Sequence, residues 1–148
     1  MNLLTVGIVG CGRICNGAHV PALKNIDGIK VKYACDLIAE KAETVKEKLG
    51  AEIACTDYRT VLADKQVDCV FVLTPNYAHY EVTMAALKAG KHVFCEKPIT
   101  VNYALSQEMY REAEKQGKIL NIGVCNRYHK SVELLEKLNR EGVFGNIY

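Results

Sequence analysis

Short apolar runs and longer mixed segments alternate along the chain. The apolar runs predict strands at Leu3–Val9, Lys30–Cys35, Glu52–Cys55, Cys69–Leu73, Lys91–Cys95 and Ile119–Val124. The mixed segments predict helices at Arg13–Lys24, Ala39–Leu49, Tyr58–Ala63, Tyr77–Ala89, Asn102–Gln116 and Ser131–Glu141. Gly50, Gly90 and Gly117 directly follow three of these segments, as is typical of helix C-termini.

Regular alternation of strands and helices indicates an α/β fold. Right-handed crossover connections turn such a pattern into a parallel sheet with helices on both faces. Six strands predict a doubly wound parallel sheet (Rossmann fold) with strand order 3-2-1-4-5-6. Ligands of this fold bind outside the carboxyl ends of the strands, so chemistry is expected in the loops that follow them.

Composition and charge exclude several classes of protein. The chain has 148 residues, of which 49% are hydrophobic and 24% charged, enough for one globular domain with its own core. The net charge of +2 is made of interspersed signs, which argues against nucleic-acid binding. No apolar run approaches the ~20 residues of a membrane-spanning helix. The segment Met1–Val9 lacks the flanks of a signal peptide and is interpreted as a strand.

Seven cysteines are distributed along the chain without any C-x-x-C spacing. That spacing is needed for the common zinc and thioredoxin-like motifs, so we expect neither, and no metal site. Most of these cysteines lie in apolar runs and are expected to pack as small core residues. An odd total of cysteines, most of them expected in the core, fits a reducing compartment, and the expected location is cytoplasmic.

A glycine-rich turn follows the first predicted strand. Gly10 and Gly12 fit a G-x-G-x-x-G fingerprint in which Cys15, also small, occupies the third glycine position. Gly10 permits a tight turn, and Gly12 lets a pyrophosphate approach the backbone at the N-terminus of the next helix. The turn predicts dinucleotide binding by Gly10, Cys11, Gly12, Arg13 and Ile14. The alternative is a tight strand–helix turn that binds no ligand.

Asp36 ends the second strand, where an acidic residue of this fold accepts hydrogen bonds from the ribose hydroxyls of the cofactor. A carboxylate at that position repels a 2′-phosphate, and Leu37 and Ile38 offer no cation to bind one. We therefore expect NAD rather than NADP, although Lys41 is close enough in sequence to leave the choice open. The alternative role for Asp36 is that of a helix N-cap.

Further motifs follow the later strands. They are Thr74-Pro75-Asn76 with His79, and Ala89-Gly90-Lys91 followed by Glu96-Lys97-Pro98. Together with the glycine turn and His19-Val20-Pro21, they resemble the Gfo/Idh/MocA oxidoreductase family in order and spacing. The resemblance runs from Val6 to about Tyr148.

The resemblance implies an NAD(P)-dependent dehydrogenase that acts on sugars, polyols or related cyclic alcohols and ketones. Lys97 matches the family lysine beside the nicotinamide and the substrate hydroxyl, where an ammonium group stabilises charge on the reacting oxygen. The alternative for Lys97 is a solvated surface side chain. Glu96 is expected to orient the loop. The residues implied to lie near the cofactor are Thr74, Pro75, Asn76, His79, Glu96, Lys97 and Arg127.

The end of the chain departs from the strand–helix rhythm. Residues 1–124 form the predicted dinucleotide-binding domain, and residues 125–148 are interpreted as a crossover into a substrate domain that is otherwise absent. Gly142 and Gly145 lead to a predicted new strand at Ile147-Tyr148. Because the resemblance places the general acid/base in that further domain, we expect this chain alone to bind NAD(H) with little turnover. The implied full-length protein is a homo-oligomer; the alternative is a non-enzymatic NAD-binding or redox-sensing module.

Overall fold

A parallel sheet forms the centre of the molecule in the computed structural model, which describes residues 3–146. The strands are β1 (Leu4–Val9), β2 (Ile29–Cys35), β3 (Ile53–Cys55), β4 (Cys69–Val72), β5 (His92–Cys95) and β6 (Leu120–Ile122). Their order is β3-β2-β1-β4-β5-β6, and every neighbouring pair is parallel. The predicted α/β class and strand order are therefore confirmed; some strand ends are one or two residues shorter than expected, and β2 is one residue longer.

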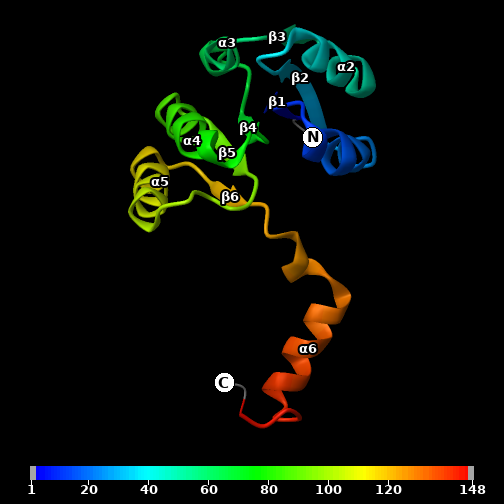
Figure 1. The fold of residues 1–148 in the computed structure, drawn as a ribbon, viewed down its shortest axis with the longest axis vertical. Helices are drawn as coiled ribbons and strands as arrows, with labels where there is room; N and C mark the ends of the chain where they lie inside the picture. The colour runs from blue at the N-terminus through cyan, green and yellow to red at the C-terminus, as the bar shows by residue number, and fades with distance from the viewer. Residues whose placement is uncertain (1–2, 147–148) are drawn as a thin grey trace.

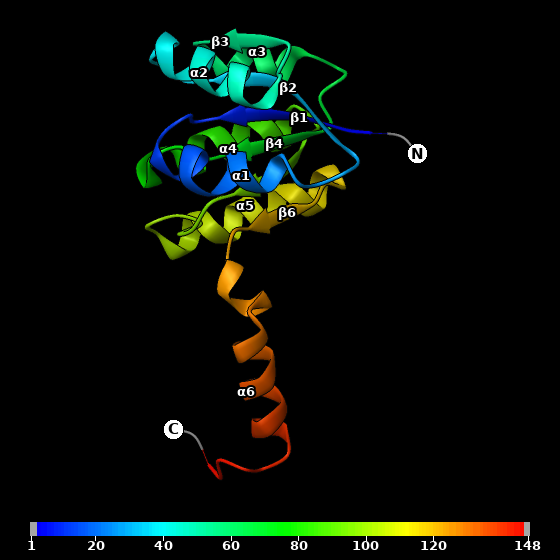
Figure 2. The same ribbon diagram turned by 90° about the vertical axis from the view of Figure 1, so that its right-hand side faces the viewer.

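Helices cover both faces of this sheet (Figures 1 and 2). One face carries α3 (Tyr58–Ala63), α4 (His79–Lys88) and α5 (Tyr103–Gln116), and the other carries α1 (Val20–Leu23) and α2 (Ala39–Leu49). Short helical turns η1 (Cys15–His19), η2 (Asn76–Ala78) and η3 (Cys125–Tyr128) lie next to three of the strand ends. This two-sided arrangement leaves the loops after the strands free along one edge of the sheet.

Each face of the sheet has its own apolar core. Val70, Val72 and Val93 point toward α3, α4 and α5 and are at most 1% exposed. Val6 and Ile8 point toward α1 and α2 and are fully buried. Side chains of successive strand residues alternate between the faces, so strands covered on both sides are apolar throughout. This explains why the central strands appear as continuous apolar runs in the sequence.

The first predicted helix contains a wider turn. Helical structure does span Arg13 to Leu23, but residues Cys15–His19 form a π-helical turn in which the N–H of Val20 donates to the carbonyl of Cys15. Pro21 explains the change: it has no N–H to donate to Gly17, and its ring needs room beside that carbonyl. The wider turn provides that room without breaking the helix.

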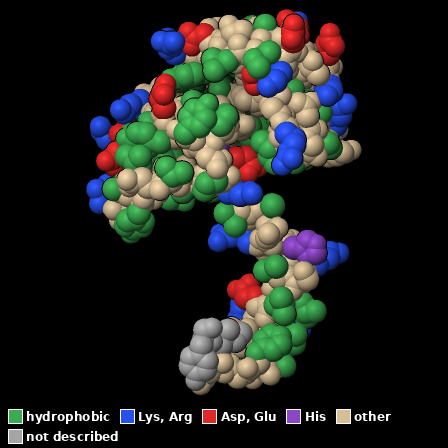
Figure 3. Space-filling view, viewed as in Figure 1, with side chains coloured by type: hydrophobic (Ala, Val, Ile, Leu, Met, Phe, Trp, Pro, Cys, Tyr) green, Lys and Arg blue, Asp and Glu red, His purple; other side chains and the backbone are tan. Residues whose placement is uncertain are grey.

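The last helix, α6 (Lys130–Arg140), projects away from the sheet (Figures 1 and 2). Val132, Leu134 and Leu135 on this helix remain 38–55% exposed, and Figure 3 shows apolar side chains gathered along one side of it. The predicted strand at Ile147-Tyr148 lies outside the described residues. Among the helices of residues 3–146, none combines the length and apolar character needed to cross a membrane.

Candidate nucleotide site at the carboxyl edge of the sheet

The glycine turn fits tightly against the end of β4. Gly10 has a φ of +101°, and its N–H donates to the carbonyl of Cys35 over 2.8 Å. A Cβ atom at Gly10 would lie 2.5 Å from the carbonyl carbon of Leu73 and 2.7 Å from the amide nitrogen of Thr74. Gly12 differs, because a Cβ atom there would meet nothing within 4 Å. Gly10 is thus required by the fold, whereas Gly12 leaves space open outside the turn.

Asn16 holds the turn from the inside. Its Nδ2 donates to the carbonyls of Cys11 and Gly12 over 2.9 and 3.0 Å, and its Oδ1 accepts from Lys48 Nζ over 2.7 Å. The first N–H groups of the helix that begins at Arg13 have no intrahelical acceptor, so they remain available to an anion. Asn16 was not singled out from the sequence, since its contact with Lys48 joins residues 32 positions apart.

The carboxylate of Asp36 connects the end of β2 to the glycine turn. Oδ2 accepts from the N–H of Cys11 over 2.8 Å, and Oδ1 accepts from the N–H of Ile38 over 3.0 Å. The N-cap of α2 is Ile38, which has no side-chain cap, so the alternative N-cap role of Asp36 is not the one observed. Each carboxylate oxygen has two lone pairs, so both retain capacity for a further donor such as a ribose hydroxyl.

Buried thiols surround this turn. Cys11, Cys15 and Cys35 are at most 2% exposed, and Cys11 Sγ lies 3.5 Å from the carbonyl of Cys35. Burial and the neighbouring Cys55 raise the pKa of the Cys35 thiol above its ordinary range. The contact with Cys15, together with burial, raises the pKa of Cys11 far above its ordinary value. Cys15 therefore does fit the third glycine position as a small, buried residue.

Glu96 is anchored below the loop that follows β5. Its Oε1 lies 2.7 Å from Nε2 of His19, and its Oε2 accepts from the N–H of Lys97 over 3.0 Å. The side chains of His19 and Glu96 are each 12% exposed, and the His19 ring packs edge-on against Phe71 and Phe94. Lys97 itself is exposed. Glu96 thus orients the loop, and His19 is its partner.

His79 joins two of the loops at this edge. It is 1% exposed; its Nδ1 lies 2.7 Å from the carbonyl oxygen of Pro98, and its Nε2 lies 2.9 Å from that of Thr74. The peptide between Lys97 and Pro98 is cis. With both ring nitrogens occupied, His79 has none free for a direct contact with a cofactor. It lies instead beneath the residues that were expected to contact one.

The loops after β1, β4 and β5 therefore meet. Gly10 packs on Leu73 and Thr74, and His79 joins Thr74 to Pro98. The hydroxyl of Thr74 is buried and has no hydrogen-bond partner among the described residues. Three exposed residues complete this rim: Pro75, Asn76 and Lys97. The residues that the sequence predicted after these strands thus lie along one edge of the sheet. Asn76 and Lys97 carry hydrogen-bond donors there, which suit an anionic dinucleotide.

Arg127 stands beside β6, in η3. Its side chain is exposed and lines a shallow cavity of about 230 Å³ with Tyr110, Ile122 and Tyr128, among others. No hydrogen bond or ion pair links Arg127 to Glu96 or Lys97 in the described residues. Its expected place near the nicotinamide remains a prediction.

Comparison with known proteins identifies the family. A model of the Gfo/Idh/MocA oxidoreductases, described as an oxidoreductase family with an NAD-binding Rossmann fold, matches residues 4–124. The chain belongs to this family. It is the NAD(P)-binding Rossmann domain of a Gfo/Idh/MocA protein, as the motifs at the strand ends indicated.

Several Gfo/Idh/MocA relatives are similar over nearly the whole chain. Inositol 2-dehydrogenase from Salmonella paratyphi B is 37% identical over 145 residues, which cover 96% of this chain and 43% of that protein. D-glucoside 3-dehydrogenase from Escherichia coli is 32% identical and is matched over 41% of its length. The chain thus spans less than half of the curated relatives it matches.

Solved structures agree with this family assignment. A 3-ketoreductase from Actinomadura kijaniata, in complex with NADP and TDP-benzene, superimposes with a TM-score of 0.92 at 29% identity. Myo-inositol 2-dehydrogenase from Lactobacillus plantarum gives a TM-score of 0.90 at 32% identity. Each match covers 99% of this chain, and 45% and 43% of the respective structures.

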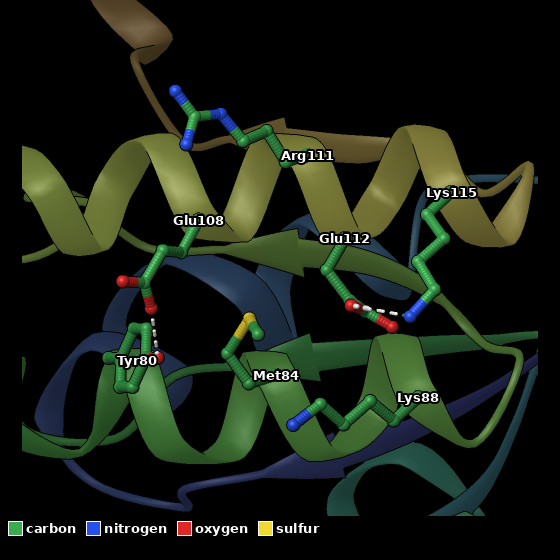
Figure 4. Close-up of a pocket in the computed structure, with 7 residues that line it drawn as sticks. All are labelled: Tyr80, Met84, Lys88, Glu108, Arg111, Glu112 and Lys115. Carbon is green, nitrogen blue, oxygen red and sulfur yellow. Dashed lines mark hydrogen bonds and ion pairs between the residues drawn. The ribbon is translucent and has the colours of Figure 1, made fainter.

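A cavity of about 340 Å³ lies elsewhere in this Gfo/Idh/MocA domain, between α4 and α5 (Figure 4). Tyr80 donates to Glu108 over 2.6 Å at one end, and Glu112 pairs with Lys115 at the other. These side chains belong to the helices α4 and α5, and none of them comes from the loops that follow the strands. We therefore assign the nucleotide site to the loops and not to this cavity.

Proposed function

We propose that this chain binds NAD(H) at the carboxyl edge of its sheet, as the nucleotide-binding part of a dehydrogenase. The observation that carries the proposal is the open turn at Gly12, flanked by free helix N–H groups and by the Asp36 carboxylate. A pyrophosphate is stabilised by N–H groups at a helix N-terminus, and ribose hydroxyls by an acceptor at the end of the second strand. The residues present thus fit both ends of an adenosine diphosphate.

The same carboxylate favours NAD over NADP. The 2′-phosphate of NADP would approach the negatively charged Asp36, while Leu37 and Ile38, exposed by 88% and 48%, provide no cation. Like charges at close range oppose binding, and the pairing that NADP sites obtain from arginine is missing from these two positions. The 3-ketoreductase from Actinomadura kijaniata was solved with NADP, so preference is a property to measure on this chain.

For the full-length protein we propose hydride transfer with a sugar, a polyol or a related cyclic alcohol or ketone. The named activities of the inositol and glucoside dehydrogenases support this substrate class. When bound, NAD(H) supplies the hydride donor or acceptor. Lys97, exposed at the rim, would donate a hydrogen bond to the reacting oxygen and stabilise charge there. Glu96 holds the backbone N–H of Lys97 and so fixes where the loop presents that ammonium group.

We also propose that residues 125–148 lead into a substrate domain, with residues 1–124 as the nucleotide-binding domain. The projecting helix α6 supports this division, because it buries none of its residues, whereas each of α1–α5 buries apolar residues. The free thiols support a reducing, cytoplasmic location: Cys69 and Cys95, for example, are buried and unpaired, and burial raises the pKa of each to about 11.

Direct titration of the chain with NADH tests the proposed function. The chain contains no tryptophan, so the fluorescence of the nicotinamide can be followed with little protein background. Asp36→Ala removes two accepting oxygens and is expected to weaken NADH binding at least about tenfold, since hydrogen bonds to charged groups contribute about 1.5–3 kcal/mol each. Asp27→Ala, the same change at an exposed position, serves as the matched control and should bind like the wild type.

Asp36→Asn separates the charge of this residue from its shape. Asparagine loses the negative charge, so the preference for NADH over NADPH should narrow; it keeps only one of the two oxygens that accept from the N–H groups of Cys11 and Ile38, so a urea midpoint is measured alongside. An unchanged dissociation constant for NADH in Asp36→Ala would contradict the assignment of this site. A wild-type chain that binds no NADH would refute the proposed function as a whole.

A further inference from the structure

The buried ring of His79 contacts two groups of the same chemical kind. Nδ1 lies 2.7 Å from the carbonyl oxygen of Pro98, and Nε2 lies 2.9 Å from the carbonyl oxygen of Thr74. A backbone carbonyl can only accept hydrogen bonds, whichever residue carries it. The ring is 1% exposed, so solvent does not supply alternative partners.

Counting donors fixes what this ring must carry. A neutral imidazole has one N–H and one bare nitrogen, so one of its two contacts would set a lone pair of nitrogen against a lone pair of oxygen. Only an imidazolium has N–H groups on both nitrogens and satisfies both carbonyls. At 2.7 and 2.9 Å, both nitrogens are within hydrogen-bond distance of their carbonyl oxygens.

We propose that His79 is a positioning residue that carries protons on both ring nitrogens and binds the loop after β4 to the loop after β5. In doing so it fixes the backbone around Lys97, one residue before the Pro98 carbonyl it holds. This inference rests on the proposed function, since it is through Lys97 and the nicotinamide half of the cofactor that His79 acts. The adenosine half is bound by the glycine turn and Asp36, which His79 does not touch.

The surrounding charges permit such a cation. The loop after β4 carries no ionisable side chain from Leu73 to Asn76, and the loop after β5 carries Glu96 and Lys97, of opposite sign. On α4 itself, Glu81 in the first turn is the nearest acid in sequence. Burial of the ring and the positive end of the α4 dipole both disfavour a cation at this position, and the hydrogen bonds to the two carbonyl oxygens are the contacts that oppose these effects.

Nitrogen-15 spectra of the histidine rings test the protonation directly, on the 148-residue chain without cofactor. The chain has four histidines, and His79 is assigned by the signal that disappears in His79→Gln. We expect two protonated ring nitrogens for His79 at pH 7. One bare and one protonated nitrogen would overturn the proposal. Because this measurement needs no cofactor and can be read from the unsubstituted chain, it is independent of whether NADH binds.

A comparison of two ligands tests the positioning role. His79→Gln should weaken NADH binding about tenfold and leave binding of ADP-ribose, which lacks the nicotinamide, within twofold of the wild type. Equal losses for both ligands would show a general structural defect and contradict the positioning role. His92→Gln is the matched control. This half-buried histidine is the first residue of β5, and its Nδ1 accepts from the N–H of Ile119. The affinities for NADH and for ADP-ribose should both stay unchanged. If His79→Gln does not fold, the His79 signal is assigned by elimination from His19→Gln, His92→Gln and His129→Gln, and the protonation of its ring in the unsubstituted chain then decides the proposal.

Discussion

Gly10 and Gly12 lie two residues apart in the same turn, yet a methyl group at each should have opposite effects on stability. In Gly10→Ala the new Cβ would lie 2.5 Å from the Leu73 carbonyl carbon and 2.6 Å from its oxygen, and the residue would hold a φ of +101°. A non-glycine residue in such a backbone region costs about 1–3 kcal/mol, and overpacking costs a similar amount. These backbone atoms cannot rotate away, so we expect a loss of about 3 kcal/mol in the free energy of unfolding.

Gly12→Ala meets no such obstacle in the protein. Nothing lies within 4 Å of the new Cβ, so the fold should be unaffected or stabilised by about 0.4–1 kcal/mol through the unfolded state. The methyl group would occupy the space where the pyrophosphate approaches the backbone. Losing even one charge-assisted hydrogen bond to a phosphate oxygen, about 1.5–3 kcal/mol, corresponds to a roughly 10- to 100-fold weaker affinity for NADH.

Urea unfolding and NADH titration on the same samples separate these effects. Gly10→Ala should lower the urea midpoint and also lose affinity, whereas Gly12→Ala should keep its midpoint and lose affinity alone. Gly17→Ala introduces the same methyl into η1, with nothing within 4 Å, and is the control for both assays. Wild-type affinity in Gly12→Ala would refute the pyrophosphate assignment. An unchanged midpoint in Gly10→Ala would refute the argument from its close approach to β4.

Two further predictions concern the opposite edge of the sheet. Asp64 accepts from Lys32 over 2.5 Å and from Tyr33 over 2.9 Å, and the Lys32 contact contributes most to lowering its pKa to about 2. The ionised Asp64 carboxylate should therefore stabilise the fold fully above its ordinary pKa of 3.8, and this stabilisation should be lost as the pH falls toward 2. In a series of urea midpoints against pH, Asp64→Asn should show a smaller decrease than the wild type over this range. Lys91 is 6% exposed and donates to the carbonyls of Asp64 and Val67, so Lys91→Met should cost about 2 kcal/mol at pH 7 by thermal or urea unfolding. Burial lowers the pKa of Lys91, so the unfolded chain binds more protons than the folded one as the pH approaches the ordinary lysine value of 10.5. The free energy of unfolding of the wild type should therefore rise with pH between the lowered pKa and 10.5. A parallel rise in Lys91→Met would contradict this account.

The positions of the strands and turns could be predicted from the sequence because they depend on local patterns, and the strand order follows from the doubly wound fold that their alternation indicates. Apolar runs bounded by glycine mark buried strands, and the spacing of Gly10, Gly12 and Asp36 places chemistry at the strand ends. The π-helical turn was not predicted, because Pro21 near the end of the expected helix is compatible with several ways of relieving its missing N–H. The ends of individual strands and helices need little information beyond the nearest neighbours of each residue.

The supporting contacts of the site could not be predicted in the same way. His19 and Glu96 are 77 residues apart in the chain, and Asn16 and Lys48 are 32 apart. No periodicity connects such pairs, since they become neighbours only when the crossover helices bring the loops together. His79 shows the same limit: its motif suggested a place near the cofactor, while the direction of its ring depends on the fold.

The contact between His19 and Glu96 also bears on the order in which the site can form. His19 is made early in synthesis, but its partner emerges 77 residues later, at the end of the fifth strand. Likewise, the glycine turn packs on Leu73 and Thr74, which do not exist until the fourth strand is complete. A nascent chain that contains the fingerprint and Asp36 alone therefore lacks the surfaces that hold them. Nucleotide capture is expected to begin only after Pro98 has left the ribosome, as a late event in the folding of the domain.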